Sequence, residues 1–208
     1  MQELVIFDFD KTLILDDSIV EFSLILIKAG YLKEDFWDKS GLSSVDRSCF
    51  SFLAKDKILN IWNSLECLER EKLLKKMRLK IEWNEDLVNH LRFCSSAYDI
   101  LISSASFSFI LLDLLRFKNI KYNHIHCGNK LEGDKEVFVN NSGVHKLLAL
   151  NKLMLMHPYK VKYSFSDSIH DLPILLAADR GYVVCEGHGF KDDWSNNFSV
   201  ENWRKLKH

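Results

Sequence analysis

The chain has 208 residues, of which 47% are hydrophobic and 27% charged, as in one globular domain with or without a large insertion. Its 28 basic and 29 acidic residues leave a formal net charge of −1, which argues against nucleic acid as a partner. The five cysteines are scattered without a CxxC pair. This usage favours reduced thiols in a cytoplasmic protein over a disulfide framework or a zinc site.

The sequence offers no transmembrane segment and no signal-peptide pattern. Its longest stretch without a charged residue, residues 100–112, is shorter than the roughly 20 apolar residues that a spanning helix needs. Residues 19–32 are strongly apolar, but Glu21 and Lys28 interrupt them, which favours a packed helix. We therefore expect a cytoplasmic protein without a membrane span.

The first predicted element is a buried parallel strand at residues 4–7, followed at once by Asp8, Asp10 and Thr12. Residues just past the carboxyl end of such a strand lie where open α/β sheets bind their ligands. Two carboxylates are costly to bury there without a cation, so the pair indicates a metal ion and phosphate chemistry. A solvated Asp-rich turn is the structural alternative.

Only helical signals follow between residues 18 and 93. Ser18, with Glu21 three residues later, is expected to cap a first helix that stops near Gly30. Because no strand signal interrupts this block, we interpret it as a cap inserted into the core. Further helices are expected at about residues 44–53, 58–81 and 85–94.

Strand and helix signals alternate in the rest of the chain, which predicts an α/β fold with a doubly wound, Rossmann-like parallel sheet. The predicted core domain comprises residues 1–16 and 95–208, and the predicted cap domain comprises residues 17–94. The expected strands are residues 99–103, 122–126, 163–166 and 181–184, and the expected helices are residues 107–117, 145–156 and 172–179.

Three later segments carry polar residues next to these strands and helices. Ser104 follows a strand and precedes a helix, where a hydroxyl and backbone N–H groups can bind phosphate. Lys146 lies near the start of a helix, which is electrostatically unfavourable unless an anion compensates it. Asp167 and Asp171 follow another strand at a spacing of four. Taken singly, each has an ordinary structural reading as a helix cap or a surface residue.

Taken together, the ordered acid-x-acid-x-Thr, Ser, Lys and Asp-x-x-x-Asp motifs resemble those of the haloacid dehalogenase-like hydrolase superfamily. The segments FDFDKTL at residues 7–13, ISSAS at 102–106 and SDSIHDLP at 166–173 are similar to its phosphoserine-phosphatase-like branch, subfamily IB. The helical insertion looks like the all-helical C1-type cap of that branch. The resemblance covers nearly the whole chain.

This resemblance implies a catalytic mechanism and a cofactor. Asp8 would be the nucleophile that forms an aspartyl-phosphate. Asp10 would be the general acid for the leaving alkoxide and then the general base for water. Mg²⁺ would be held by the Asp8 carboxylate, the Asp10 backbone carbonyl and Asp167.

The resemblance also implies which residues bind the phosphate group. Thr12, Ser104, Ala105 and Lys146 are expected to bind it, with Thr12 also supporting the turn after the nucleophile. Asp171 would not contact the phosphate itself but would hold Lys146 or a water bound to the metal.

The implied substrate is a small phosphorylated metabolite, a soluble phosphomonoester. Asp10 favours a phosphatase over a dehalogenase, because an alkoxide leaves poorly without a proton. His170 and the Ser-Ala-Ser sequence depart from phosphoserine phosphatases, so the substrate stays open. Arg47 could bind a substrate carboxylate or be a plain surface residue. The alternatives are a phospho-accepting signalling module, a non-catalytic phosphate binder, or a phosphatidylglycerophosphate-type lipid phosphatase.

Overall fold

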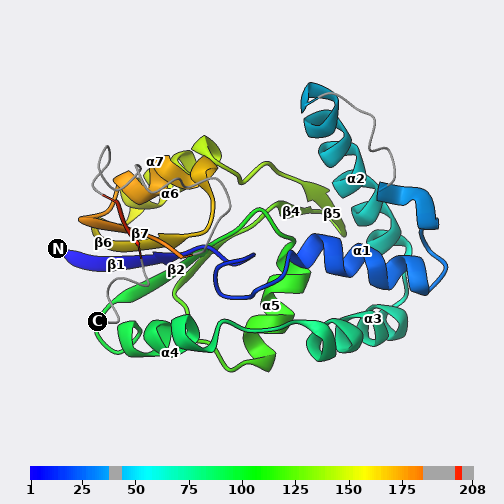
Figure 1. The fold of residues 1–208 in the computed structure, drawn as a ribbon, viewed down its shortest axis with the longest axis horizontal. Helices are drawn as coiled ribbons and strands as arrows, with labels where there is room; N and C mark the ends of the chain where they lie inside the picture. Colours follow the sequence, from blue (N-terminus) through cyan, green and yellow to red (C-terminus); the bar gives the residue numbers. More distant parts are fainter. Residues whose placement is uncertain (38–43, 185–199, 203–208) are drawn as a thin grey trace.

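The computed structural model describes residues 1–37, 44–184 and 200–202, and for residues 44–51 and 200–202 it describes the backbone alone. Its centre is a parallel six-stranded sheet with the order β3-β2-β1-β6-β7-β8 (Figure 1). The chain runs outward from β1 on one side and returns to β6 on the other, so the predicted doubly wound α/β class is confirmed. The strands are β1 Gln2–Phe7, β2 Asp99–Ser103, β3 His124–His126, β6 Tyr159–Ser166, β7 Arg180–Val183 and β8 Val200–Asn202.

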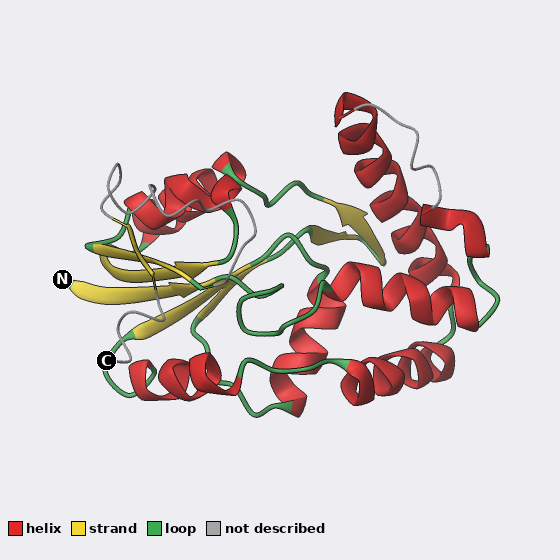
Figure 2. Cartoon of the chain, in the orientation of Figure 1, coloured by secondary structure: helices red, strands yellow, loops and turns green. Residues whose placement is uncertain are grey.

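Helices cover both faces of the sheet, as Figure 2 shows in red and yellow. The side chains of β1 alternate between the two faces, and all of those from Leu4 to Phe7 are buried. Leu4 packs towards α6 and Phe7 stacks on Phe165 at 4.7 Å on the other face. The covering helices are α4 Glu85–Cys94 and α5 Ser108–Phe117 on one face, and α6 Val144–Met156 and α7 Leu172–Leu176 on the other.

A group of helices extends away from the sheet, on the side where Figure 1 shows blue and cyan. It packs on α5, where Trp62 stacks on Phe109 at 3.8 Å. The predicted cap of residues 17–94 also includes α4, which packs on the sheet instead, with the His90 ring 5.5 Å from that of Phe165. The division into cap and core therefore stays a prediction. The extending elements are α1 Ser18–Lys28, the 3-10 helix η1 Glu34–Trp37, α2 Ser44–Ser64 and α3 Cys67–Lys80.

Two details of the helical block differ from expectation. The N-cap residue of helix α1 is Asp17 and not the expected Ser18. The Asp17 side chain accepts from the Val20 N–H, and Ser18 is the first helical residue. The expected helices at residues 44–53 and 58–81 are instead a long α2 and a shorter α3. Leu65 and Glu66 separate the two helices. A reciprocal capping box begins α3 and stabilises the break there.

A β-hairpin between β3 and α6 was not expected from the sequence. It consists of β4 Asn129–Glu132 and β5 Lys135–Phe138, joined by a two-residue turn in which Gly133 has φ of +60°. The hairpin contacts α2, where the Asn63 side chain donates to the Glu136 carbonyl and accepts from its N–H, at 2.9 and 3.0 Å. The hairpin thus joins the core to the helical block.

Two negative expectations can be compared with the described residues. None of the described helices is long and apolar enough to cross a membrane. Cys67, Cys94 and Cys127 are free thiols. The side chains of Cys49 and Cys185 lie outside the described residues, and the expectation of reduced thiols stays a prediction.

Candidate active site

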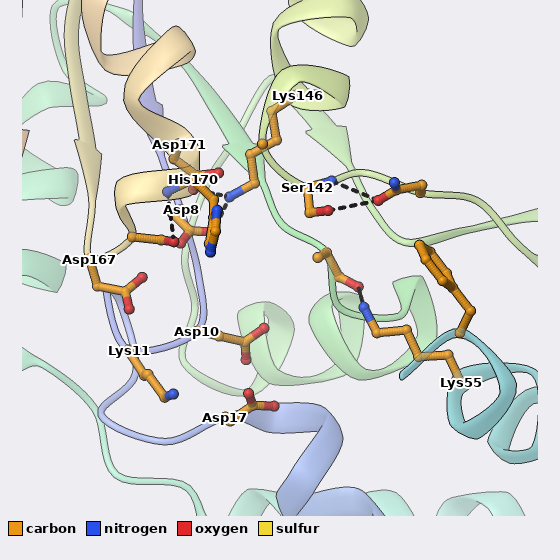
Figure 3. A pocket seen from close by; sticks show the side chains of 15 residues that line it. Asp8, Asp10, Lys11, Asp17, Lys55, Ser142, Lys146, Asp167, His170 and Asp171 are labelled. Carbon is orange, nitrogen blue, oxygen red and sulfur yellow. Dashed lines mark hydrogen bonds and ion pairs between the residues drawn. The ribbon is translucent and has the colours of Figure 1, made fainter. Parts of the chain in front are cut away.

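A pocket of about 530 Å³ lies at the carboxyl end of β1, between the sheet and α2. Its walls combine the end of β1, the loop after β2, the start of α6 and the turn after β6 (Figure 3). Segments far apart in the sequence meet here because parallel strands end at the same edge. Most of the predicted site residues line this pocket: Asp8, Asp10, Ala105, Lys146, Asp167 and Asp171.

Asp8 is the first residue after β1 and is 8% exposed. Its N–H donates to the Phe165 carbonyl at 2.9 Å, which fixes the backbone against β6. One carboxylate oxygen accepts from Lys146 Nζ at 2.7 Å, and the other accepts from the Ser166 hydroxyl at 3.3 Å. Burial raises the pKa of Asp8 well above its ordinary value, although the Lys146 charge opposes this shift.

Lys146 lies in the first turn of α6 and is 3% exposed. Its ammonium donates to Asp8 at 2.7 Å and to Asp171 at 2.5 Å. Burial alone would lower the pKa of Lys146, but the two carboxylates outweigh it and hold the pKa above its usual range. They also explain how a buried cation is tolerated at a helix N-terminus.

We expect Lys146→Met to destabilise the fold, because it leaves the Asp8 and Asp171 carboxylates buried without their cation. The free energy of unfolding from urea denaturation at neutral pH should fall by about 3–5 kcal/mol. The control is Lys160→Met, which removes an exposed ion pair with Asp179 and should change stability little. Equal effects of the two substitutions would contradict this account of Lys146.

Asp10 is held at its two carboxylate oxygens by different elements. The backbone N–H of Ser18 donates to one oxygen at 2.7 Å, and the Ser104 hydroxyl donates to the other at 3.4 Å. Burial raises the pKa of Asp10 to about 6, and the nearby Asp17 charge contributes in the same direction. A carboxyl group with this pKa can give and take a proton near neutral pH, as general acid-base catalysis requires.

Thr12 brings two carboxylates together beneath the pocket. Its buried hydroxyl lies 3.5 Å from an Asp8 oxygen and 3.4 Å from an Asp167 oxygen, and it accepts from the Asp167 N–H at 3.0 Å. Burial raises the pKa of Asp167. Thr12 thus supports the carboxylates, and its expected contact with phosphate stays a prediction.

The donor set formed by Asp8 and Asp167 fits a divalent cation. With Asp171, three acids lie beside the buried ammonium of Lys146, so their ionised forms carry an excess of negative charge that a cation would offset. The described residues contain no cluster of three or more His, Cys, Asp or Glu side chains that could hold a metal. Mg²⁺ does not require such a cluster, because it commonly binds through one or two carboxylates with waters and substrate phosphate.

The loop after β2 is clamped against its neighbours. The Ser104 Oγ accepts from the Ser106 N–H at 3.0 Å, and the Asn141 side chain donates to the Ser104 carbonyl at 2.8 Å. Gly128 passes so close that a Cβ there would lie 2.2 Å from the Ala105 carbonyl oxygen, so only glycine fits. The structure places Ser104 beside Asp10, while its expected role in phosphate binding stays a prediction.

Sequence reasoning missed several residues of the site. Ser166 donates to both Asp8 and Asp171, and its position at the end of β6 was a usable signal. Lys55 in α2 lines the pocket, although no pattern marks it in the sequence. The side chain of Arg47, expected to bind a carboxylate or to lie on the surface, lies outside the described residues.

Comparisons with known proteins agree with the fold. A protein from Bordetella pertussis Tohama I with unknown function aligns with a TM-score of 0.75 and 16% identity, over 97% of this chain and 99% of that one. A phosphoserine phosphohydrolase-like protein from Francisella tularensis aligns with a TM-score of 0.62 and 20% identity, over 100% and 98% of the two chains. An apo phosphoserine phosphatase aligns with a TM-score of 0.62 and 15% identity, over 100% and 99%.

At these identities the structural matches establish the fold alone. A comparison with curated proteins finds no match. The family model of haloacid dehalogenase-like hydrolases matches residues 5–176, a span that includes every predicted site residue. The chain therefore belongs to the haloacid dehalogenase-like hydrolases.

Proposed function

We propose that this protein is a Mg²⁺-dependent phosphatase that hydrolyses a small soluble phosphomonoester through an aspartyl-phosphate. The observation that carries the proposal is the pairing of two acids at the end of β1. The Lys146 ammonium binds the Asp8 carboxylate and opposes the rise in pKa that burial causes there, and Asp10, to which no such cation is bonded among the described residues, has a pKa of about 6. One acid is thus suited to attack and the other to transfer a proton. The phosphoserine phosphatases among the structural neighbours agree with this reaction class.

The reaction has two chemical steps. An Asp8 oxygen attacks phosphorus, the bond from phosphorus to the ester oxygen breaks, and Asp10 gives its proton to the departing alkoxide. Asp10 then takes a proton from water as that water attacks the phosphorus of the aspartyl-phosphate, which releases inorganic phosphate and restores Asp8.

Three residues would bind the transferring phosphoryl oxygens. Lys146 supplies positive charge, and Ser104 and Ala105 supply the clamped loop beside it. Asp171 positions the Lys146 ammonium, to which it is bonded. Ser104 now donates to Asp10, so its hydroxyl would rotate from that long bond to a substrate oxygen.

Mg²⁺ would be held by the Asp8 and Asp167 carboxylates and the Asp10 backbone carbonyl. When bound, it would neutralise charge on the phosphate oxygens and lower the repulsion that an attacking carboxylate meets. The support for this site is the convergence of the two carboxylates on the Thr12 hydroxyl.

Metal binding should appear as a pH-dependent gain in stability. The acids of the pocket have raised pKa values, so the folded state holds protons more tightly than the unfolded state between the ordinary 3.8 and about 6. The free energy of unfolding of the metal-free protein should therefore fall as pH rises through this window. Mg²⁺ should raise the melting temperature more at about pH 7.5 than at about pH 5.

The matched control for this experiment is Asp167→Asn, measured by the same thermal unfolding with and without Mg²⁺. Because other groups also titrate, the contribution of the site is the difference between the wild type and this variant. The variant should gain less stability from Mg²⁺. An equal gain in both proteins would contradict the proposed ligands.

The proposed function is tested by release of phosphate from p-nitrophenyl phosphate with Mg²⁺. A signalling module or a non-catalytic binder would show no turnover above background. A panel of phosphorylated metabolites and a lipid phosphate would then separate the proposed soluble substrate from the phosphatidylglycerophosphate-type alternative. The cap of residues 17–94 and a cytoplasmic location remain part of this proposal.

A further inference from the structure

Lys55 enters the pocket from the helical block, opposite the catalytic acids. Its ammonium donates to the Ala105 carbonyl oxygen at 3.3 Å, so it reaches the loop that carries Ser104. Figure 3 shows it coming from α2, with Asp10 between it and Asp167 in this view. The side chain is half-buried and contributes to the pocket wall. It therefore lies beside the space that a substrate would occupy.

The ammonium of Lys55 is held differently from that of Lys146. In contrast to Lys146, which bonds to two carboxylates, Lys55 has a neutral carbonyl as its partner. Among the described residues, no carboxylate forms an ion pair with it. Burial lowers the pKa of Lys55, although the charges of Asp10 and Asp17 oppose the shift. An anion beside the ammonium would offset the cost of burial.

The surroundings of Lys55 favour a strong interaction with such an anion. Its Nζ lies 5.6 Å from the centroid of the Phe138 ring on β5, and the Phe52 ring of α2 packs edge-on to Phe138 at 5.3 Å. Phe52 also lines the pocket. The two rings shield part of the ammonium from water, although Phe52 is itself 42% exposed, and charges attract one another more strongly where water is excluded.

We propose that Lys55 is a specificity-determining residue that binds a second anionic group on the leaving-group side of a phosphomonoester. In the proposed reaction Asp8 attacks the phosphoryl group, Lys146 and the loop after β2 bind its oxygens, and Asp10 protonates the leaving oxygen. Because Lys55 enters from α2 and its charge interacts with that of Asp10, its ammonium faces the alcohol part of the substrate. The substrate class is a phosphate ester whose alcohol carries a carboxylate or a second phosphate. This assignment rests on the proposed function.

The test compares three substrates built on one two-carbon alcohol. Ethyl phosphate has no second charge, phosphoglycolate has a carboxylate, and 1,2-ethanediol bisphosphate has a second phosphate. For the preferred anionic substrate, Lys55→Met should lower kcat/KM by roughly 10- to 100-fold, the value of a charged hydrogen bond, and hydrolysis of ethyl phosphate should change little. Lys55→Arg should retain most of the preference because it keeps the charge.

The matched control is Lys57→Met on the same helix, since Lys57 is exposed and lies over the Phe36 ring outside the pocket wall. This variant should behave as the wild type with all three substrates. Equal losses on every substrate in Lys55→Met would mean that Lys55 positions the loop of Ala105 or binds the phosphoryl group common to all three esters, and would overturn the inference. The inference would also be overturned if the wild type hydrolysed neither anionic ester with a higher kcat/KM than ethyl phosphate. Failure of the wild type to hydrolyse even p-nitrophenyl phosphate would instead refute the proposed function.

Discussion

Replacement of Asp8 by Asn should abolish phosphatase activity, with kcat lower by at least about 10⁴-fold. An amide oxygen is too weak a nucleophile to form the acyl phosphate. The fold should survive, because the amide can still accept from the Lys146 ammonium. Steady-state hydrolysis of p-nitrophenyl phosphate measures the loss, and thermal unfolding measures the stability. In the metal-free protein the variant should be at least as stable as the wild type, since one of the crowded carboxylates has lost its charge.

The control for Asp8 is Asp16→Asn, a change of the same type in the same loop. The Asp16 carboxylate accepts from the Glu82 N–H at 2.9 Å and lies outside the pocket wall. An amide oxygen can replace it there, so activity should stay close to that of the wild type. Activity of Asp8→Asn near that of its control would show that another residue is the nucleophile.

The second large effect is expected at Asp10, and its size should depend on the leaving group. Asn at this position can still accept from the Ser18 N–H, so the site keeps its shape but loses its transferable proton. With an alkyl phosphate, Asp10→Asn should lower kcat/KM by at least about 10²-fold. With p-nitrophenyl phosphate, whose phenolate leaves without protonation, the loss in kcat/KM should be much smaller.

This comparison of leaving groups is the internal control for Asp10. A merely structural defect would reduce hydrolysis of the two esters by the same factor. Equal losses would therefore remove the general-acid role from Asp10, whereas a loss that grows with the pKa of the departing alcohol supports it.

The acids of the site could be predicted from the sequence because of where they stand relative to two strands. Asp8 follows β1 directly, and Asp167 follows β6 directly. In a parallel sheet these ends are neighbours, so residues far apart in the sequence meet by topology alone. The same logic applies to Ser104 after β2. The strands that precede these residues, apolar in β1 and β2 and rich in aromatic residues in β6, made them recognisable.

Other features depend on packing that the sequence does not display. Residues 44–81 contain no glycine or proline, so neither of the usual helix breakers marks the break between α2 and α3. The hairpin did have a signal in Gly133, but its strands are mostly polar and charged, without the alternation of a half-buried strand. Lys55 becomes distinct from Lys57 only through the neighbours that the fold gives it, above all the Ala105 carbonyl at the pocket.

The bond from the Ser18 N–H to Asp10 has a consequence for engineering this chain. Ser18 belongs to the first turn of α1, the helix with which the extending helical block begins. The Asp10 carboxylate, which carries the proton, is therefore oriented by that first turn. A chimaera that grafts foreign helices onto this sheet would have to retain that first turn, or its acid would be free to rotate. Diversification of substrate range by exchange of the helical layer is thus confined to segments beyond that junction.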